Sequence, residues 1–406
     1  MDPGRPPVPG RDRRRLTPAA GGPRCMPPRR PGNRRRPLPD MKGTVMAFRD
    51  MPRRERLLEI GRFHSDTPAF LEAKELLTTL HGDWRTGAEG SVVFVVGENG
   101  AGKSTVADDY MSDVAAETGG TFYRGEDVEG PDGEELPRSW CVLVQTDKGY
   151  ERPAVKLEIG PRPSFNSLLS DYLLLLGYRA RTRSTFGQLM SLAVKHSLAQ
   201  KVRVLVADES QEILWQAGSE NGAKLFRHLL NLARVQIVLM GELDALNIPE
   251  VNGAVRRRTT ARHVIRPFEC TPDDPESPFM AFSRDAESIL PFDRPTGLNS
   301  PLTALRMHIA CGGYPGVYVP FLKNAAGNAI KLDLDSITTK VLADTYRSQF
   351  GADDGENPFL DEDPDPARFM VMARRRKARQ DREDARKGKP PSPGRSPRWS
   401  DMDLTK

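Results

Sequence analysis

The feature that most constrains this sequence of 406 residues is a glycine-rich stretch between an apolar run and a helix-like run. The letters VVFVVGENGAGKSTVADDY occupy residues 92–110. Five consecutive apolar residues are typical of a strand that is buried on both faces. Gly97 to Ser104 then satisfies the pattern G-x-x-x-x-G-K-[ST], and the letters after it fit a helix. A strand that leads through this pattern into a helix predicts a phosphate-binding loop, or P-loop.

Each residue type in this loop has a physical reason. Glycines let backbone N–H groups turn inward around phosphate oxygens, and the helix that begins there adds the positive end of its dipole. We expect Lys103 to reach the β- and γ-phosphates and the Ser104 hydroxyl to ligate Mg²⁺, so ATP and Mg²⁺ are the implied cofactors. The residues predicted to bind the nucleotide are Gly97, Glu98, Asn99, Gly100, Ala101, Gly102, Lys103, Ser104 and Thr105.

A second apolar run supplies the acidic half of such a site. The segment VLVADES, residues 204–210, ends in two adjacent carboxylates. Asp208 would hold Mg²⁺, and Glu209 would polarise the attacking water. The alternative is an ordinary strand followed by a solvated acidic turn. A glutamate directly after the aspartate favours ATP hydrolysis over the GTPase arrangement, in which a glutamine from elsewhere orients the water. We therefore predict an ATPase.

Arginines offer a further catalytic group. The segment AVRRRTTARHVIRPF, residues 254–268, follows the fourth predicted strand. Its three arginines, Arg256, Arg257 and Arg258, lie where an arginine finger of one subunit would reach the γ-phosphate of the next. We choose Arg258 among the three, and the alternative is a basic solvated surface.

Other basic residues are candidates for DNA contact. In GYRARTRST, Arg179, Arg181 and Arg183 alternate along a predicted loop, and a surface that follows DNA needs such side chains aimed at phosphates. A solvated loop is the alternative. The segment ARFMVMARRRKARQDREDARKG, residues 367–388, predicts a helix that binds DNA, docks on a protein or is simply a charged tail. The net charge of +5, concentrated at the two ends, is weak support for a nucleic-acid partner.

The order of these segments predicts an α/β fold. Strand-like and helix-like runs alternate over residues 51–269, which indicates a parallel five-stranded sheet between helices, preceded by lead-in helices. We expect an acidic hairpin insertion at the surface near residues 119–150, with a turn at Pro131, Asp132 and Gly133. Residues 270–350 predict a small all-α lid domain. Its helix patterns lie near residues 278–289, 300–311, 316–329 and 334–348.

The two ends of the chain have the composition of disordered tails. Residues 1–50 are rich in arginine and proline, and residues 351–406 are charged. The first tail has two further interpretations: an electrostatic DNA arm, or residues before a true start at Met41, Met46 or Met51.

Several classes of protein are excluded. A run of eighteen apolar residues is missing, so we expect no membrane span, and the basic N-terminus lacks the apolar region of a secretory signal. The six histidines are scattered, which suggests neither a metal site nor a catalytic triad. The cysteines share no metal-ligand or CxxC spacing, which favours a reduced, cytoplasmic protein. They are Cys25, Cys141, Cys270 and Cys311.

Taken together, the motifs resemble the ATPases of the AAA+ superfamily. The order of P-loop, ADESQ, HLLNLARVQIVLMGELDAL (residues 228–246) and RRR, followed by a helical lid, is similar to TniB-type transposition ATPases within the ORC-like group. The segment ILPF and the lid GGYPGVYVPFLKNAAGNAIKLDLDSI, residues 312–337, also resemble that family. The resemblance covers about residues 55–345. It implies a homo-oligomer, a ring or filament, that assembles on double-stranded DNA with ATP and recruits or activates a transposase, together with a target-selection protein.

Two departures from the family pattern bear on activity. Where the family has a polar sensor residue after Gly241, this chain has Glu242, which would be unfavourable beside phosphate unless it turns away. The lid also lacks a sensor arginine in PGVYVPF. We therefore expect slow hydrolysis. The rival interpretations are an ATP-gated interaction module with little or no turnover, and another ORC-like DNA-associated or secretion-associated ATPase.

Overall fold

The computed structural model describes Phe48 and residues 51–61, 63–84, 89–129, 135–181 and 183–375. The first predicted tail lies almost entirely outside the described residues, and so does the chain after residue 375. Within the described part of the chain, no helix combines the length and the apolar character that crossing a bilayer requires.

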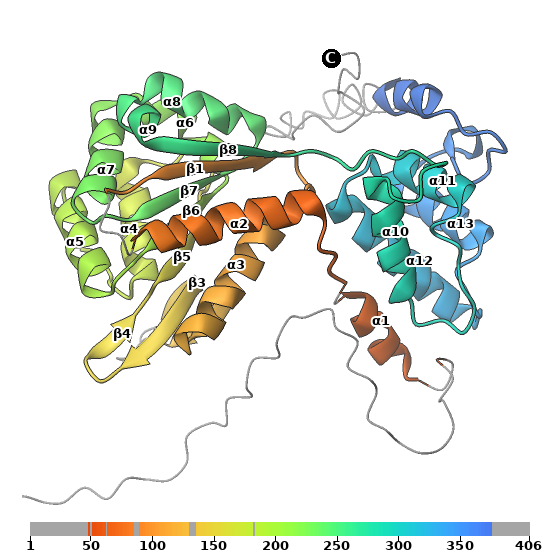
Figure 1. Ribbon diagram of the computed structural model, residues 1–406, viewed down its shortest axis with the longest axis horizontal. Helices are drawn as coiled ribbons and strands as arrows, with labels where there is room; N and C mark the ends of the chain where they lie inside the picture. The colour runs from red at the N-terminus through yellow and green to blue at the C-terminus, as the bar shows by residue number, and fades with distance from the viewer. Residues whose placement is uncertain are drawn as a thin grey trace, which may run out of the picture. The chain divides into compact units, whose positions relative to one another are not determined.

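One mixed sheet holds eight strands of the described chain. Their order is β2-β3-β5-β6-β7-β1-β8, and β4 pairs with β3. The five neighbours β5, β6, β7, β1 and β8 run parallel, so the predicted parallel five-stranded sheet is confirmed (Figure 1). The strand bounds are β1 Val92–Gly97, β2 Thr121–Glu129, β3 Glu135–Thr146, β4 Gly149–Glu151, β5 Ala154–Glu158, β6 Val204–Asp208, β7 Gln236–Gly241 and β8 Thr259–Ile265.

The predicted acidic insertion is a hairpin, but it extends the sheet instead of lying apart on the surface. Strands β2 and β3 pair antiparallel, and β3 continues the sheet beside β5, where Cys141 pairs with Val155. The reason is that β5 would otherwise leave one row of backbone N–H and C=O groups unpaired at the edge. The predicted turn at residues 131–133 lies outside the described residues.

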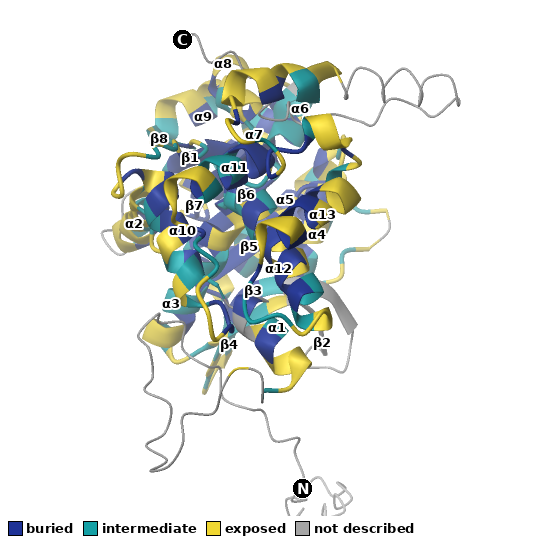
Figure 2. Cartoon of the chain, turned by 90° about the vertical axis from the view of Figure 1, so that its right-hand side faces the viewer, coloured by how far each residue is buried: buried dark blue, intermediate teal, exposed yellow. Residues whose placement is uncertain are grey.

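The apolar strands are covered by helices on both faces. Along β1, Val92, Phe94 and Val96 belong to one apolar core, and the alternate residues Val93 and Val95 belong to another. This alternation follows from the strand period of two, and it explains why the strand reads as a continuous apolar run. Figure 2 shows the buried strands lying among more exposed helices.

Helices α2 and α3 cover the second of these cores, and α4, α5 and α7 cover the first. The helices of this part are α2 Pro68–Asp83, α3 Lys103–Thr118, α4 Phe165–Leu175, α5 Phe186–Ala199, α6 Leu214–Ala217, α7 Glu220–Asn231, α8 Ile248–Val251 and α9 Gly253–Arg258.

The helical part after residue 270 has its own apolar core. Its helices, α10 Pro278–Ser288, α11 Pro301–Cys311, α12 Pro315–Lys331 and α13 Thr339–Phe350, lie close to the predicted positions. Helix α1, Arg53–Gly61, contributes Ile60 to this core, although we expected the lead-in helices to belong with the sheet. Pro320 lies inside α12.

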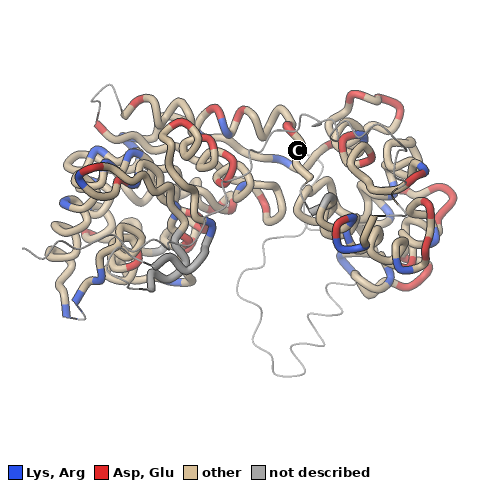
Figure 3. The backbone as a smooth tube through the Cα atoms, turned by 90° about the horizontal axis from the view of Figure 1, so that it is seen from below, with Lys and Arg blue, Asp and Glu red and all other residues tan. Residues whose placement is uncertain are grey.

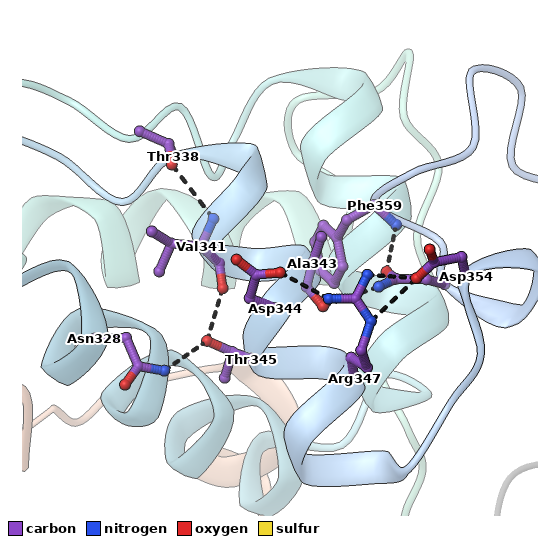
Figure 4. A network of polar contacts seen from close by, with 10 residues as sticks. Asn328, Thr338, Val341, Ala343, Asp344, Thr345, Arg347, Asp354 and Phe359 are labelled. Atoms are coloured by element: carbon purple, nitrogen blue, oxygen red, sulfur yellow. Dashed lines mark hydrogen bonds and ion pairs between the residues drawn. The ribbon is translucent and has the colours of Figure 1, made fainter. Parts of the chain in front are cut away.

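The helical part also extends further than predicted. Ala352 and Phe359 are buried in the same core, the ring of Phe359 stacks on that of Phe321, and residues 366–375 are helical. Polar contacts hold the connection: Arg347 pairs with Asp354, and the Asn357 side chain donates to the Ala343 carbonyl at 2.9 Å (Figure 4). Ordered structure therefore continues past residue 350, where the lid domain was predicted to end, because a few buried aromatic side chains anchor a segment rich in charged residues.

Candidate nucleotide site

The glycine-rich loop has the backbone that its sequence predicts. Strand β1 ends at Gly97 and helix α3 begins at Lys103. Gly100 and Gly102 have φ angles of 87° and 99°, in the left-handed region that side chains disfavour. Gly102 is the residue before the first turn of α3, so the unpaired N–H groups of that turn point toward the loop. This arrangement is an anion site of the P-loop kind.

Lys103 lies inside this loop. Its side chain is only 6% exposed, and its Nζ donates to the carbonyl oxygens of Gly97 at 2.7 Å and Glu98 at 3.0 Å. Burial lowers the pKa of Lys103, and the nearby carboxylates of Glu209 and Asp208 partly oppose that change. A triphosphate would supply the compensating negative charge that the two carbonyl dipoles supply only in part.

Asp208 and Ser104 form the predicted metal-binding pair. Asp208 is the last residue of β6, and the Ser104 hydroxyl on α3 donates to its Oδ2 at 3.2 Å. A hydroxyl and a carboxylate that meet beside the phosphate loop are the oxygen ligands that Mg²⁺ prefers, with further positions filled by water and phosphate. The residues present therefore fit Mg²⁺. Groups of three or more His, Cys, Asp or Glu side chains that could hold a metal ion do not occur among the described residues.

Glu209 is held in a strained conformation next to the metal-binding pair. Its φ of 57° and ψ of 37° are unusual for a residue other than glycine, and such strain concentrates at functional sites. The side chain of Gln211 donates from Nε2 to Glu209 Oε2 at 2.6 Å and accepts the Glu242 N–H at 3.0 Å through Oε1. Gln211 thus links the predicted base to the sensor position.

Gln211 was not singled out as a candidate site residue at the sequence level. The signal that would have revealed it is Gly241. A Cβ on Gly241 would collide with Gln211 Oε1, so the glycine makes room for this link. Because Gly241 and Gln211 are thirty residues apart, only the pairing of β6 with β7 brings them together.

Glu242 faces the P-loop and does not turn away from it. The Asn99 side chain donates to Glu242 Oε1 at 3.2 Å. Burial raises the pKa of Glu242, with an opposing contribution from Lys103 and a further increase from Glu209. The Glu242 carboxyl group therefore lies within electrostatic reach of Lys103 and Glu209.

A cavity of about 420 Å³ adjoins these residues. One side is the P-loop with Lys103, Ser104 and Glu209, and the other is apolar and aromatic. The apolar lining comes from the segment before α2, from α2 itself, from the end of β8 and the residues after it, and from the helical part. It includes Phe63, Phe70, Ile265, Phe268, Phe282, Pro315, Val319 and Pro320. At its edge the Gly316 N–H donates to the Gly100 carbonyl at 2.8 Å. A polar end and an aromatic end suit the phosphates and the base of a nucleotide.

Arg258 lies far from this site within its own chain. It ends α9, just before β8, and Thr259 pairs with Val92 at the start of β1, whereas the P-loop follows the end of β1. Arg258 forms an ion pair with Glu89 and donates to Asn231 Oδ1 at 3.0 Å. Only a neighbouring subunit could bring it to a γ-phosphate, so its role as a finger stays a prediction.

The other predicted basic contacts are exposed. Arg179, Arg181 and Arg183 lie in the loop between α4 and α5, and all three side chains are exposed. Figure 3 shows basic and acidic residues intermingled along the described backbone. The tail helix predicted over residues 367–388 is described only up to residue 375.

Part of the chain matches a known family of proteins. Residues 87–248 match a family model described as an AAA domain. No match to the chain was found among curated proteins. Three solved structures overlap with it in part, each at low identity. Cdc6p from Pyrobaculum aerophilum is 15% identical over 72% of this chain and 70% of that one, with a TM-score of 0.48. ORC1 of Aeropyrum pernix in complex with DNA is 16% identical over 75% and 70%, with a TM-score of 0.48. A chain of Drosophila ORC bound to DNA is 14% identical over 80% and 72%, with a TM-score of 0.46.

Proposed function

We propose, from the premise that residues 87–248 form an AAA-type P-loop ATPase domain in an AAA+ fold, that this chain binds and hydrolyses ATP with Mg²⁺. The observation that carries the proposal is the convergence of four groups on one cavity. Lys103 lines it, the Ser104–Asp208 pair lies at its metal end, and Glu209 is poised beside that pair. Lys103 and Ser104 come from the start of α3, and Asp208 and Glu209 come from the end of β6 and the residue after it, so the fold itself brings distant parts of the sequence together.

The residues divide the reaction among them. Lys103 leaves the carbonyls of Gly97 and Glu98 to donate to the β- and γ-phosphates. Mg²⁺, when bound, neutralises charge on the same phosphates. Glu209 accepts a proton from the attacking water, which gives ADP and phosphate. Gln211 Nε2 donates to Glu209 Oε2, so the Glu209 carboxylate can accept from water through Oε1 or through the second lone pair of Oε2.

We further propose that the chain acts as a TniB-type regulator of transposition, oligomerising on double-stranded DNA and recruiting or activating a transposase. Support comes from the sequence resemblance, from the exposed Arg179, Arg181 and Arg183, and from the position of Arg258 at the sheet edge away from its own site. An arginine so placed is useful to catalysis only between subunits. If this proposal is right, we expect a transposase gene to lie next to the gene that encodes this chain.

A second candidate function is an ATP-gated binding module with little turnover. One observation favours it: Glu242 points into the site, and its backbone N–H fixes the Gln211 that holds Glu209. A carboxylate beside the γ-phosphate weakens phosphate binding, and a held base slows hydrolysis. Even so, a nucleotide-bound state alone would serve as an assembly signal.

Turnover measured with and without duplex DNA separates the two. We expect the wild type to release phosphate slowly and DNA to stimulate this release. Lys103→Ala should lose both phosphate release and ATP binding. Glu209→Gln should lose phosphate release but still bind ATP. Lys148→Ala, at an exposed lysine in a turn, is the matched control and should behave as the wild type. Tight ATP binding without turnover would favour the binding module, and failure to bind ATP would overturn both.

A further inference from the structure

A lysine lies inside the sheet next to the predicted metal-binding pair. Lys156 is the middle residue of β5, where it pairs with Val206 of β6, and it is only 6% exposed. Its strand neighbours Ala154, Val155 and Leu157 are buried and apolar. Burying a lysine is costly unless opposite charges surround it, so its contacts explain why it is tolerated there.

The Lys156 ammonium has two carboxylates and an aromatic ring around it. Its Nζ is 3.2 Å from Asp208 Oδ2 and 3.8 Å from Asp108 Oδ1, the latter on α3 one turn after Ser104. Asp108 Oδ1 is buried and has no hydrogen-bond partner, so Lys156 is its main source of compensation. On the remaining side the ring of Trp140, on β3, faces the ammonium with 4.7 Å to the ring centroid.

The decisive detail is which oxygen Lys156 contacts. Asp208 Oδ2 also accepts the hydrogen bond from Ser104, the other predicted metal ligand. The ammonium thus carries positive charge at the carboxylate oxygen that a divalent cation would bind. A lysine close to a dication is repelled by it, and both compete for the same carboxylate.

We propose that Lys156 is a positioning residue for Mg²⁺. It holds Asp208 in the metal-free site and competes with the cation for Asp208 Oδ2. When the cation displaces the Lys156 ammonium, the contact of that ammonium with Trp140 changes, and so the β2–β3 hairpin responds to the metal. The inference rests on the proposed function, since the metal enters with the nucleotide. The hairpin pairs with the sheet through β3 and β5, and Trp140 on β3 contacts the Lys156 ammonium directly, so a shift of Lys156 changes a contact of the hairpin.

Neutralising Lys156 tests this directly in the full chain. Lys156→Met keeps the length of the side chain and removes its charge, which leaves Asp208 and Asp108 to attract the cation without a competitor. At fixed ATP, Mg²⁺ is titrated and nucleotide binding is followed with a fluorescent ATP analogue. We expect the half-saturating Mg²⁺ concentration to fall by about threefold to tenfold. Lys156→Arg keeps the charge and should stay close to the wild type, and Lys148→Met, at an exposed lysine, should match it.

A second measurement, the fluorescence emission of Trp140 in the wild type, can be made even if Lys156→Met does not fold. With ATP present, Mg²⁺ should change the emission of Trp140, obtained as the difference between the wild type and Trp140→Phe. The change should have the same Mg²⁺ midpoint as nucleotide binding. In Lys156→Met it should vanish, because no ammonium faces the ring.

Any one of three results would overturn the inference. The half-saturating Mg²⁺ concentration could be unchanged or higher in Lys156→Met, or it could fall in Lys156→Arg as well. The Trp140 emission of the wild type could also fail to change when Mg²⁺ is added. If Lys156→Met fails to fold, the Trp140 signal of the wild type decides. Failure of the proposed function looks different, since the wild type would then bind no more nucleotide than Lys103→Ala with or without Mg²⁺.

Discussion

The contact between the P-loop and the first turn of α12 makes a sharp prediction for Gly316→Ala. The Gly316 N–H donates to the Gly100 carbonyl, and the two backbones are so close that a Cβ on Gly316 would lie 2.6 Å from Gly100 Cα and 3.0 Å from Gly100 O. Ordinary carbon–carbon contacts are about 3.5–4.0 Å. Since both neighbours are backbone atoms, no flexible side chain can move aside, and α12 has to shift by roughly 1 Å.

The expected cost follows from these distances. Inserting one carbon into a packed contact costs about 1–3 kcal/mol, and losing the hydrogen bond to Gly100 costs about 1 kcal/mol. We therefore expect Gly316→Ala to lower the free energy of unfolding by about 2–4 kcal/mol. Gly316 lines the nucleotide cavity, so ATP affinity should fall as well.

A matched control lies in the same helix. A Cβ on Gly327 would meet only Leu57 Cδ2, at an ordinary 3.8 Å. Because Gly327 is in the interior of α12, Gly327→Ala should raise the free energy of unfolding by about 0.5–1 kcal/mol. Urea denaturation of the two variants, followed by circular dichroism, gives both values, and a fluorescent ATP analogue gives the affinities. If Gly316→Ala is as stable as Gly327→Ala and binds ATP as the wild type does, the close contact does not exist in solution and the reasoning is refuted.

The remaining predictions concern the sensor position, the subunit interface and the domain boundary. Glu242→Gln removes a charge beside the phosphates and should raise ATP affinity by roughly threefold to tenfold near neutral pH. Burial raises the pKa of Glu242, so its charged form is unfavourable beside the phosphates and its protonated form is not. The wild type should therefore approach the variant in ATP affinity as the pH is lowered and Glu242 becomes protonated, and a ratio of dissociation constants that stays constant with pH would contradict this. Arg258→Ala should bind ATP without turnover, and mixing it with inactive Lys103→Ala should restore phosphate release because the second protein supplies the arginine; no recovery would argue against a finger at this position. Phe359→Ala should lower the free energy of unfolding by about 3–5 kcal/mol, measured by urea denaturation, whereas a change below about 1 kcal/mol would show that the segment after residue 350 is not part of the fold.

Much of the site could be predicted because its residues are neighbours in the sequence. The P-loop takes its shape from local glycines, and Ser104 follows Lys103 directly on the same helix. Asp208 was predictable because an apolar strand that ends in carboxylates is itself a local pattern. The continuous apolar run of β1 likewise predicted a strand covered on both faces, which the structure confirms.

What could not be predicted depends on contacts between distant segments. Lys156 was a visible anomaly in an apolar strand, but its partner Asp208 is 52 residues away and is brought near only by the pairing of β5 with β6. Phe359 anchors a charged segment through an aromatic ring on α12, and composition does not reveal one buried ring among many carboxylates. The sequence left open whether Glu242 turns away from the phosphate, because its neighbour Asn99 belongs to the P-loop, which follows a different strand.

Pro320 gives α12 an uneven stiffness along its length. A proline has no N–H, so the helical hydrogen bond back to residue 316 is missing, and bending the helix costs less there than elsewhere. The turn before Pro320 carries the residue that touches the phosphate loop, while the turns after it are fixed in the aromatic core by residues such as Phe321. The first turn, which contacts the phosphate loop, is therefore joined to the rest of α12 by one backbone hydrogen bond fewer than an uninterrupted helix would have.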